Sequence, residues 1–279
     1  MIPGPAVHER AYAKLNLVLQ VGRPRPDGLH PICSLFATLD LADEVQVEPA
    51  GSDRVECPGL PPGPNLATAA VEAYRRRVPE LPPLSIAIEK RIPVAAGLGG
   101  GSANAAAVLR AANRIAGSPL DAGELRELAL EIGSDVPSQV EPSHALVGGV
   151  GEVIEPVELP PLGVLLGPQR EGLATGAVYH ELDRRREWRE RLEPERLRAL
   201  AAEGAEQLAA AVHNDLTPAV LALRPELGAV LATLRAAGAL AANVTGSGPT
   251  CFGLFAHRSA AGRAGAVLPD AIVAGLRSG

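Results

Sequence analysis

A glycine-rich segment at residues 93–106, PVAAGLGGGSANAA, has the composition of an anion-binding loop. Glycine occupies four of the five positions from 97 to 101, and a helix is expected to begin at about Ser102. Glycines let successive backbone N–H groups converge on one point, and a helix N-terminus adds about half a positive charge. The GxxxxGK[ST] pattern and the βαβ context of a dinucleotide fingerprint are absent. The segment predicts a phosphate cradle of another type; the alternative is a tight strand-to-helix turn.

Two lysines stand out, because the 26 basic residues include no others than Lys14 and Lys90. A compact ammonium group on a flexible stem can do work that a planar guanidinium cannot. Lys14 lies on a predicted strand, and the alternative to a functional role is a lysine at a strand edge. Lys90 ends a predicted strand just before the glycine-rich segment, and we interpret it as a surface residue.

One carboxylate has the surroundings of a general base. Asp135, in the sequence GSDVP, lies between the end of a predicted helix and a proline. A carboxylate near a phosphate cradle could accept the proton of an attacking hydroxyl group. The alternative is an aspartate that only caps a turn.

The elements that must position these residues alternate irregularly, as in an α+β protein rather than a doubly wound sheet. Apolar residues at every second position predict a strand over 11–21, and Asn65, Asp121, Gly117 and Gly133 are expected at helix ends. Further strands are predicted at 32–39, 43–48, 84–90, 144–148, 150–158, 241–245 and 250–256. Further helices are predicted at 103–116, 121–133, 180–198 and 225–237.

Composition excludes several classes of protein. A formal charge of −6 and an aromatic content of 3% argue against a nucleic-acid binder. No run of 18 apolar residues and no secretory signal is visible, so we expect no membrane partner and a cytoplasmic location. Three widely spaced cysteines and six dispersed histidines indicate neither a disulfide scaffold nor a metal cluster. The oligomeric state is not indicated.

Four segments, in this order, resemble the GHMP kinase family. They are AKLNLVLQVGRPRPDGLH at 13–30, the glycine-rich segment, IGSDVP at 132–137 and NVTGSGPTCFGLF at 243–255. GGVGEVIEPV and HNDL (213–216) also fit the pattern. The segments together cover most of the chain in the order that the family has. Four ordered motifs are far more specific than any one of them.

The resemblance implies a fold of two domains with ATP and Mg²⁺ as cofactors. The N-terminal domain would have a ribosomal-protein-S5-like fold and bind ATP. The C-terminal domain would have a ferredoxin-like fold and lie on the substrate side, and both ligands would bind in the cleft between the domains. A proline cluster at 156–161 places the predicted boundary between domains 1–155 and 156–279. The ligands of Mg²⁺ cannot be named from the sequence.

The resemblance also implies site residues, position by position. Lys14 and Asp135 fall on the catalytic positions. The ATP-binding positions fall on Asn65, Pro93, Val94, Ala95, Ala96, Gly97, Leu98, Gly99, Gly100, Gly101, Ser102 and Ala103. The substrate-lining positions fall on Asn16, Leu29, His30, Thr175, Tyr179, Gly246 and Ser247. For Asn65 a plain helix cap, and for Gly246 and Ser247 a simple turn, are the alternatives.

One branch of the family phosphorylates a polyol linked to cytidine diphosphate, and the segment ending in His30 resembles that branch. Leu29 departs from it, because a tyrosine ring usually stacks on cytosine at this position. Tyr179 follows Thr175 by four residues and would supply a ring from the same helix face, unless it is a core residue. The other open interpretations are a kinase of homoserine or a mevalonate phosphate, and a non-catalytic nucleotide-binding homologue.

Overall fold

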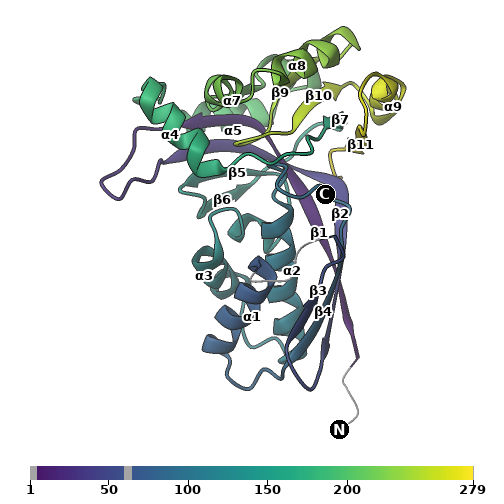
Figure 1. Ribbon diagram of the computed structural model, residues 1–279. Coiled ribbons are helices and arrows are strands. Elements are labelled where there is room, and N and C mark those ends of the chain that lie inside the picture. Colours follow the sequence, from purple (N-terminus) through teal and green to yellow (C-terminus); the bar gives the residue numbers. More distant parts are fainter. Residues whose placement is uncertain (1–4, 60–64, 279) are drawn as a thin grey trace. The chain divides into compact units, whose positions relative to one another are not determined.

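The computed structural model describes residues 5–59 and 65–278, which form two compact units (Figure 1). Unit 1 comprises Met1–Ala13, Leu41–Ile92 and Gly99–Pro142, and unit 2 comprises Lys14–Asp40, Pro93–Leu98 and Ser143–Gly279. The strands β1 (Val7–Val21) and β2 (Ile32–Pro49) contribute residues to both units. The units are therefore discontinuous in sequence, and the predicted boundary after residue 155 falls inside unit 2. The division into an ATP-binding and a substrate-side domain stays a prediction.

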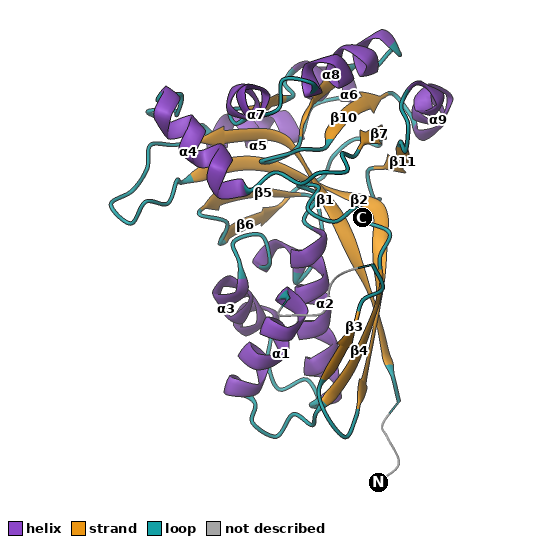
Figure 2. Cartoon of the chain, in the orientation of Figure 1, coloured by secondary structure: helices purple, strands orange, loops and turns teal. Residues whose placement is uncertain are grey.

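Unit 1 combines a small sheet with three helices. Strand β4 (Leu84–Glu89) pairs antiparallel with the C-terminal part of β2 and parallel with β3 (Arg54–Glu56). The helices are α1 (Leu66–Arg77), α2 (Gly100–Ile115) and α3 (Ala122–Ile132). Figure 2 shows these helices together beside β3 and β4.

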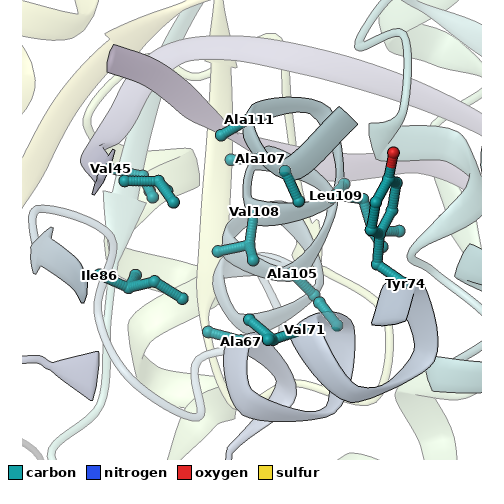
Figure 3. Close-up of a cluster of buried hydrophobic side chains, with 14 of the residues drawn as sticks. Val45, Ala67, Val71, Tyr74, Ile86, Ala105, Ala107, Val108, Leu109 and Ala111 are labelled. Atoms are coloured by element: carbon teal, nitrogen blue, oxygen red, sulfur yellow. The ribbon is translucent and has the colours of Figure 1, made fainter. Parts of the chain in front are cut away.

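The core of unit 1 is built around α2. Ala105, Ala107 and Ala111 are fully buried, and such small side chains let the helix approach its neighbours closely. Figure 3 shows Val45 and Ile86 of the sheet on one side of this helix and Tyr74 of α1 on the other. A helix that is apolar on most of its circumference is buried in the core, as α2 is in the core of unit 1. Because the core packs around α2, the position of its N-terminus within the unit is well defined.

Unit 2 contains a four-stranded sheet in the order β11-β7-β10-β9. The strands are β7 (Gly163–Gly167), β9 (Ala241–Val244), β10 (Cys251–Phe255) and β11 (Ile272–Gly275), and all their pairings are antiparallel. The helices α7 (Thr217–Leu223) and α8 (Leu227–Ala236) lie in the connection from β7 to β9, and α9 (Arg258–Ala264) lies between β10 and β11. This βαββαβ order is ferredoxin-like, as expected.

The rest of unit 2 carries the C-terminal part of β1 and the N-terminal part of β2. The N-terminal part of β2 pairs with β5 (Ala145–Gly149), which pairs with β6 (Val153–Pro156), and β1 pairs parallel with β8 (His213–Asn214). Helices α4 (Thr175–Arg185), α5 (Pro194–Ala201) and α6 (Ala205–Ala210) complete the unit.

The local signals are mostly confirmed. Asn65 is the N-cap of α1 and accepts a hydrogen bond from the Thr68 N–H group at 3.0 Å; residues 61–64 before it lie outside the described residues. Asp121 begins α3 with a complete capping box, and Gly133 ends that helix. The predicted strands 32–39 and 43–48 are one continuous strand, β2.

The predicted charged helix over 180–198 is wrong. Helix α4 ends at Arg185, because Arg186 adopts a left-handed backbone conformation with φ 56°. A second helix, α5, begins at Pro194, whose ring has no N–H group to continue a preceding helix. Interleaved charges form close pairs, such as Arg184 with Glu181, within one short helix and carry no information about its end.

Candidate functional site

The glycine-rich segment changes from loop to helix at Gly99. Residues 93–98 are an irregular loop in unit 2, and α2 begins at Gly100 in unit 1, before the predicted start at Ser102. Gly99 occupies the N-cap with φ 71°, and no side chain caps the helix. The first N–H groups of a helix have no partner inside it, so without a side-chain cap they are suited to an anion such as a phosphate.

The loop part of the segment packs against two other predicted motifs of unit 2. A Cβ atom on Gly97 would lie 2.7 Å from the Gly248 carbonyl oxygen and 2.9 Å from that of Thr245, and φ is +76°. The Lys14 N–H group donates to the Leu98 carbonyl at 2.9 Å. The structure thus brings the first strand, the glycine loop and the TGSG turn together within this unit.

Lys14 and Asn16 form a buried polar chain on β1. The Lys14 ammonium is 2.8 Å from Asn16 Oδ1, and Asn16 Nδ2 donates to Ser34 Oγ at 2.9 Å. Lys14 is 5% exposed, and its Nζ lies 4.8 Å from the centre of the Phe36 ring. The side chain is therefore no strand-edge lysine, because an amide oxygen and an aromatic face hold its charge inside the unit.

Gly246 lies directly beside this chain. A Cβ atom there would be 3.2 Å from Asn16 Oδ1 and 3.5 Å from Lys14 Nζ. The Gly246 carbonyl oxygen also accepts a hydrogen bond from Asn214 Nδ2 at 2.8 Å. The next residue, Ser247, has its hydroxyl 2.9 Å from that of Thr175 at the start of α4. Substrate residues predicted from distant parts of the chain thus meet within unit 2.

His30 is buried among aromatic rings. Its Nδ1–H donates to the Gly22 carbonyl at 2.8 Å, and its ring centre lies 5.2 Å from that of Tyr179 and 6.4 Å from that of Trp188. Its Nε2 is 3.2 Å from Asp183 Oδ1, so a carboxylate faces the outer ring nitrogen, although the two do not form a hydrogen bond.

Tyr179 and Leu29 differ in their surroundings. Tyr179 lies one helical turn after Thr175 on α4, as predicted, and also packs against the core of unit 2. Leu29 is 52% exposed. Sequence reasoning missed Trp188, although it is the single tryptophan of the chain and lies in the segment after α4. Its distance from His30 along the chain hid this contact.

Asp135 and Lys90 both belong to unit 1. Asp135 is half-buried in the turn after α3, where its carbonyl oxygen accepts a hydrogen bond from Ser138 Oγ at 2.9 Å. Its action together with Lys14 of unit 2 stays a prediction. The interpretation of Lys90 as a surface residue is wrong: its side chain is 13% exposed and forms an ion pair with the fully buried Asp43. A lysine that ends a strand looks exposed in sequence, because the partner lies 47 residues away.

The described residues contain no ready-made metal cage. Within 5–59 and 65–278, no group of three or more His, Cys, Asp or Glu side chains could hold a metal ion. The three cysteines are free thiols, and burial raises the pKa of Cys33 to about 11 and that of Cys251 to about 12. In the same ranges no helix is both long and apolar enough to cross a bilayer.

Comparisons with known proteins give the same family at both ends of the chain. Residues 65–142 match the model of the GHMP kinases N terminal domain, and residues 194–273 match that of the GHMP kinases C terminal. A 4-diphosphocytidyl-2-C-methyl-D-erythritol kinase of Anaeromyxobacter sp. is 43% identical, over 94% of this chain and 87% of the relative. The protein of that name from Streptomyces coelicolor is 42% identical, over 88% and 86% of the two chains.

Solved structures agree in fold. The crystal structure of a 4-(cytidine 5'-diphospho)-2C-methyl-D-erythritol kinase is 33% identical, with a TM-score of 0.82 over 98% of this chain and 100% of that one. A homoserine kinase from Cytophaga hutchinsonii has a TM-score of 0.71 at 18% identity, over 98% and 95% of the two chains. At that identity the second likeness shows the fold alone.

The packing of the loop leads to a prediction for Gly97→Ala. The new methyl group would meet two carbonyl oxygens and require a left-handed backbone, so we expect the free energy of unfolding to fall by about 2 kcal/mol or more. Gly176→Ala is the matched control, because nothing lies within 4 Å of its Cβ position and it lies in helix α4. Urea unfolding measures both, and equal stability of the two variants would contradict the proposed contact.

Proposed function

The chain belongs to the GHMP kinase family, and on that premise we propose that it transfers the γ-phosphoryl group of ATP to the 2-hydroxyl of 4-diphosphocytidyl-2-C-methyl-D-erythritol. This is a step in the non-mevalonate route to isoprenoid precursors. The observation that carries the choice of substrate is the cluster around His30. A buried imidazole with two aromatic rings beside it is suited to a planar base. Homoserine and mevalonate phosphates contain no such base.

Phosphoryl transfer needs alignment and charge neutralisation more than covalent chemistry. In the proposed reaction the 2-hydroxyl oxygen attacks the γ-phosphorus, its proton passes to the Asp135 carboxylate, and the bond to the β-phosphate oxygen breaks to release ADP. The uncapped N–H groups at the start of α2 would hold the phosphates. Lys14 would orient the attacking hydroxyl and offset negative charge, and Asn16 keeps its ammonium in place at 2.8 Å.

Mg²⁺ fits this arrangement as an ion carried by the nucleotide. Kinase sites usually hold it through substrate phosphates and one or two carboxylates, and no all-protein cage exists among the described residues. When bound there, it would neutralise the negative charge of the phosphates. Asp135, which its motif predicts at the site, would be the acidic side chain near the ion, and the glycine-rich segment would contact the phosphates.

A coupled assay of ADP release tests the proposal directly. With ATP and Mg²⁺, we expect ADP release that depends on the cytidyl substrate and is absent with homoserine or mevalonate phosphate. The assay's internal control is Asp135→Asn, which keeps the shape of the side chain but removes the proton acceptor. Its kcat should fall about 10²-fold or more while the Kd for ATP stays similar.

Two outcomes of this assay would contradict the proposal. Preferred turnover of homoserine or a mevalonate phosphate would assign the chain to another GHMP kinase activity. Binding of ATP with no turnover of any substrate would make it a nucleotide-binding homologue.

Lys14 gives a second prediction, because its ammonium lies in a buried place beside the Asn16 amide and the Phe36 ring. The backbone at Gly246 is also close to it. We therefore expect Lys14→Arg to lose about 10²-fold in kcat, nearly as much as Lys14→Met, although it keeps the charge. Circular dichroism of both variants checks that they fold. Full activity of Lys14→Arg would show that charge alone suffices.

Tyr179 gives a third prediction, on recognition of cytosine. If its ring stacks on the base, Tyr179→Ala should cost about 1–3 kcal/mol of substrate binding, whereas Tyr179→Phe keeps the ring and should bind normally. Leu29→Tyr should tighten binding, because Leu29 is exposed and a ring there could cover the second face. Isothermal titration with the cytidyl substrate measures all three. A lower Tm of Tyr179→Ala with an unchanged Kd would make this residue part of the core only.

A further inference from the structure

Asp43 of unit 1 is a fully buried carboxylate whose two oxygens each accept two hydrogen bonds. Oδ1 accepts from the N–H groups of Arg91 at 2.7 Å and Ile92 at 2.8 Å. Oδ2 accepts from Lys90 Nζ at 2.5 Å and from Asn104 Nδ2 at 2.9 Å. Lys90 Nζ also donates to Asn104 Oδ1 at 3.1 Å, which closes a ring of three side chains. We call Asp43, Lys90 and Asn104 the buried triad.

The buried triad connects three separate parts of unit 1. Asp43 lies on β2, Lys90 follows β4, and Asn104 lies in the first turns of α2. The backbone bonds of Asp43 to residues 91 and 92 fix the chain as it leaves β4 for the glycine-rich segment. An ion pair of this kind adds little net stability compared with well-packed apolar residues, so its distinctive contribution is a defined geometry.

The first residue of α2 is seated directly on this cluster. A Cβ atom on Gly100 would lie 3.1 Å from Lys90 Nζ and 2.9 Å from Ile92 Cγ2. Side-chain caps at Asn65 and Asp121 fix the first turns of the other two helices of unit 1, whereas the N-cap of α2 is Gly99 with no side-chain bond. The start of α2 is thus located by contact with Lys90 and Ile92 and by the Asn104 amide.

These contacts also explain why position 90 is a lysine in a chain whose other basic residues, apart from Lys14, are arginines. The ammonium group occupies a small space between a carboxylate, an amide and the Gly100 backbone. A planar guanidinium is larger and presents its donors in a rigid fork, so it could not take the same place without moving the helix.

We propose that Lys90 is a positioning residue for the nucleotide: the buried triad sets the place and direction of the α2 N-terminus, so that its uncapped N–H groups meet the phosphates of ATP. This inference rests on the proposed function in one respect, that ATP binds the glycine-rich segment. Lys90 acts through the helix backbone and through Asn104, not as a catalytic group. Its loss should therefore affect affinity for ATP more than affinity for the other substrate, whose predicted residues belong to unit 2.

The test compares Lys90→Met and Lys90→Arg with Arg75→Met in the full-length chain. Arg75 is a matched control in the same unit, because it pairs with Asp53 at 2.6 and 2.9 Å while Asp53 also accepts from the Leu84 N–H group. Titration calorimetry gives the Kd for ATP and, separately, for the cytidyl substrate, and thermal unfolding gives Tm. We expect both Lys90 variants to bind ATP about 10-fold more weakly or worse and the cytidyl substrate normally. Arg75→Met should change Tm alone.

Asn104→Ala guards against variants that fail to fold. It leaves the Lys90–Asp43 pair intact and removes only the amide on α2, so we expect a folded protein with several-fold weaker ATP binding. The inference is overturned if the folded variants bind ATP like the wild type, or if both affinities and Tm fall together as for a general loss of structure. Turnover of the cytidyl substrate by the wild type decides the proposed function, whereas the ATP Kd of the variants decides this inference.

Discussion

Two glycines of the segment 97–100 lie so close to their neighbours that one methyl group on either would collide with them. In unit 2, Gly97 faces the carbonyl oxygens of Thr245 and Gly248, and in unit 1, Gly100 faces Lys90 and Ile92. Because glycine has no side chain, carbonyl oxygens can approach the backbone at Gly97 and side chains can approach it at Gly100. Each of the two glycines is therefore held by contacts within its own unit.

Both lysines of the chain lie near these glycines with their side chains largely covered, and an amide holds each of them. Asn16 accepts from Lys14, and Asn104 accepts from Lys90. Lys90 also pairs with the carboxylate of Asp43, and the Lys14 ammonium also lies over the Phe36 ring. An ion pair between buried elements suits a positioning role, because it defines their geometry.

The His30 cluster brings together two of the few aromatic residues of the chain. The chain is 3% aromatic, yet Tyr179 and Trp188 both lie beside this one imidazole. Tyr179 comes from α4 and Trp188 from the segment that follows that helix, while His30 precedes β2. With Leu29 exposed, the rings from the α4 region offer the aromatic surface that position 29 lacks.

Features that depend on residues close together in the chain could be predicted from the amino-acid sequence. The caps at Asn65 and Asp121, the strand periods and the glycine segment were predictable because each involves residues within one or two turns, and the ordered motifs identified the family. The end of helix α4 before Arg186 could not be predicted from the sequence, since charge pairs repeat on either side of this residue.

Contacts between residues far apart in the chain could be seen only in the folded protein. The bond from the Asn16 N–H group to Thr245 Oγ1 joins residues 229 positions apart, and Asp43 reaches Asn104 across 61. Burial of Lys90 and the approach of Trp188 to His30 depend on such contacts, and no local pattern encodes them. The physical reason is that a buried charge or ring is defined by what surrounds it in space, and those groups come from other strands and helices.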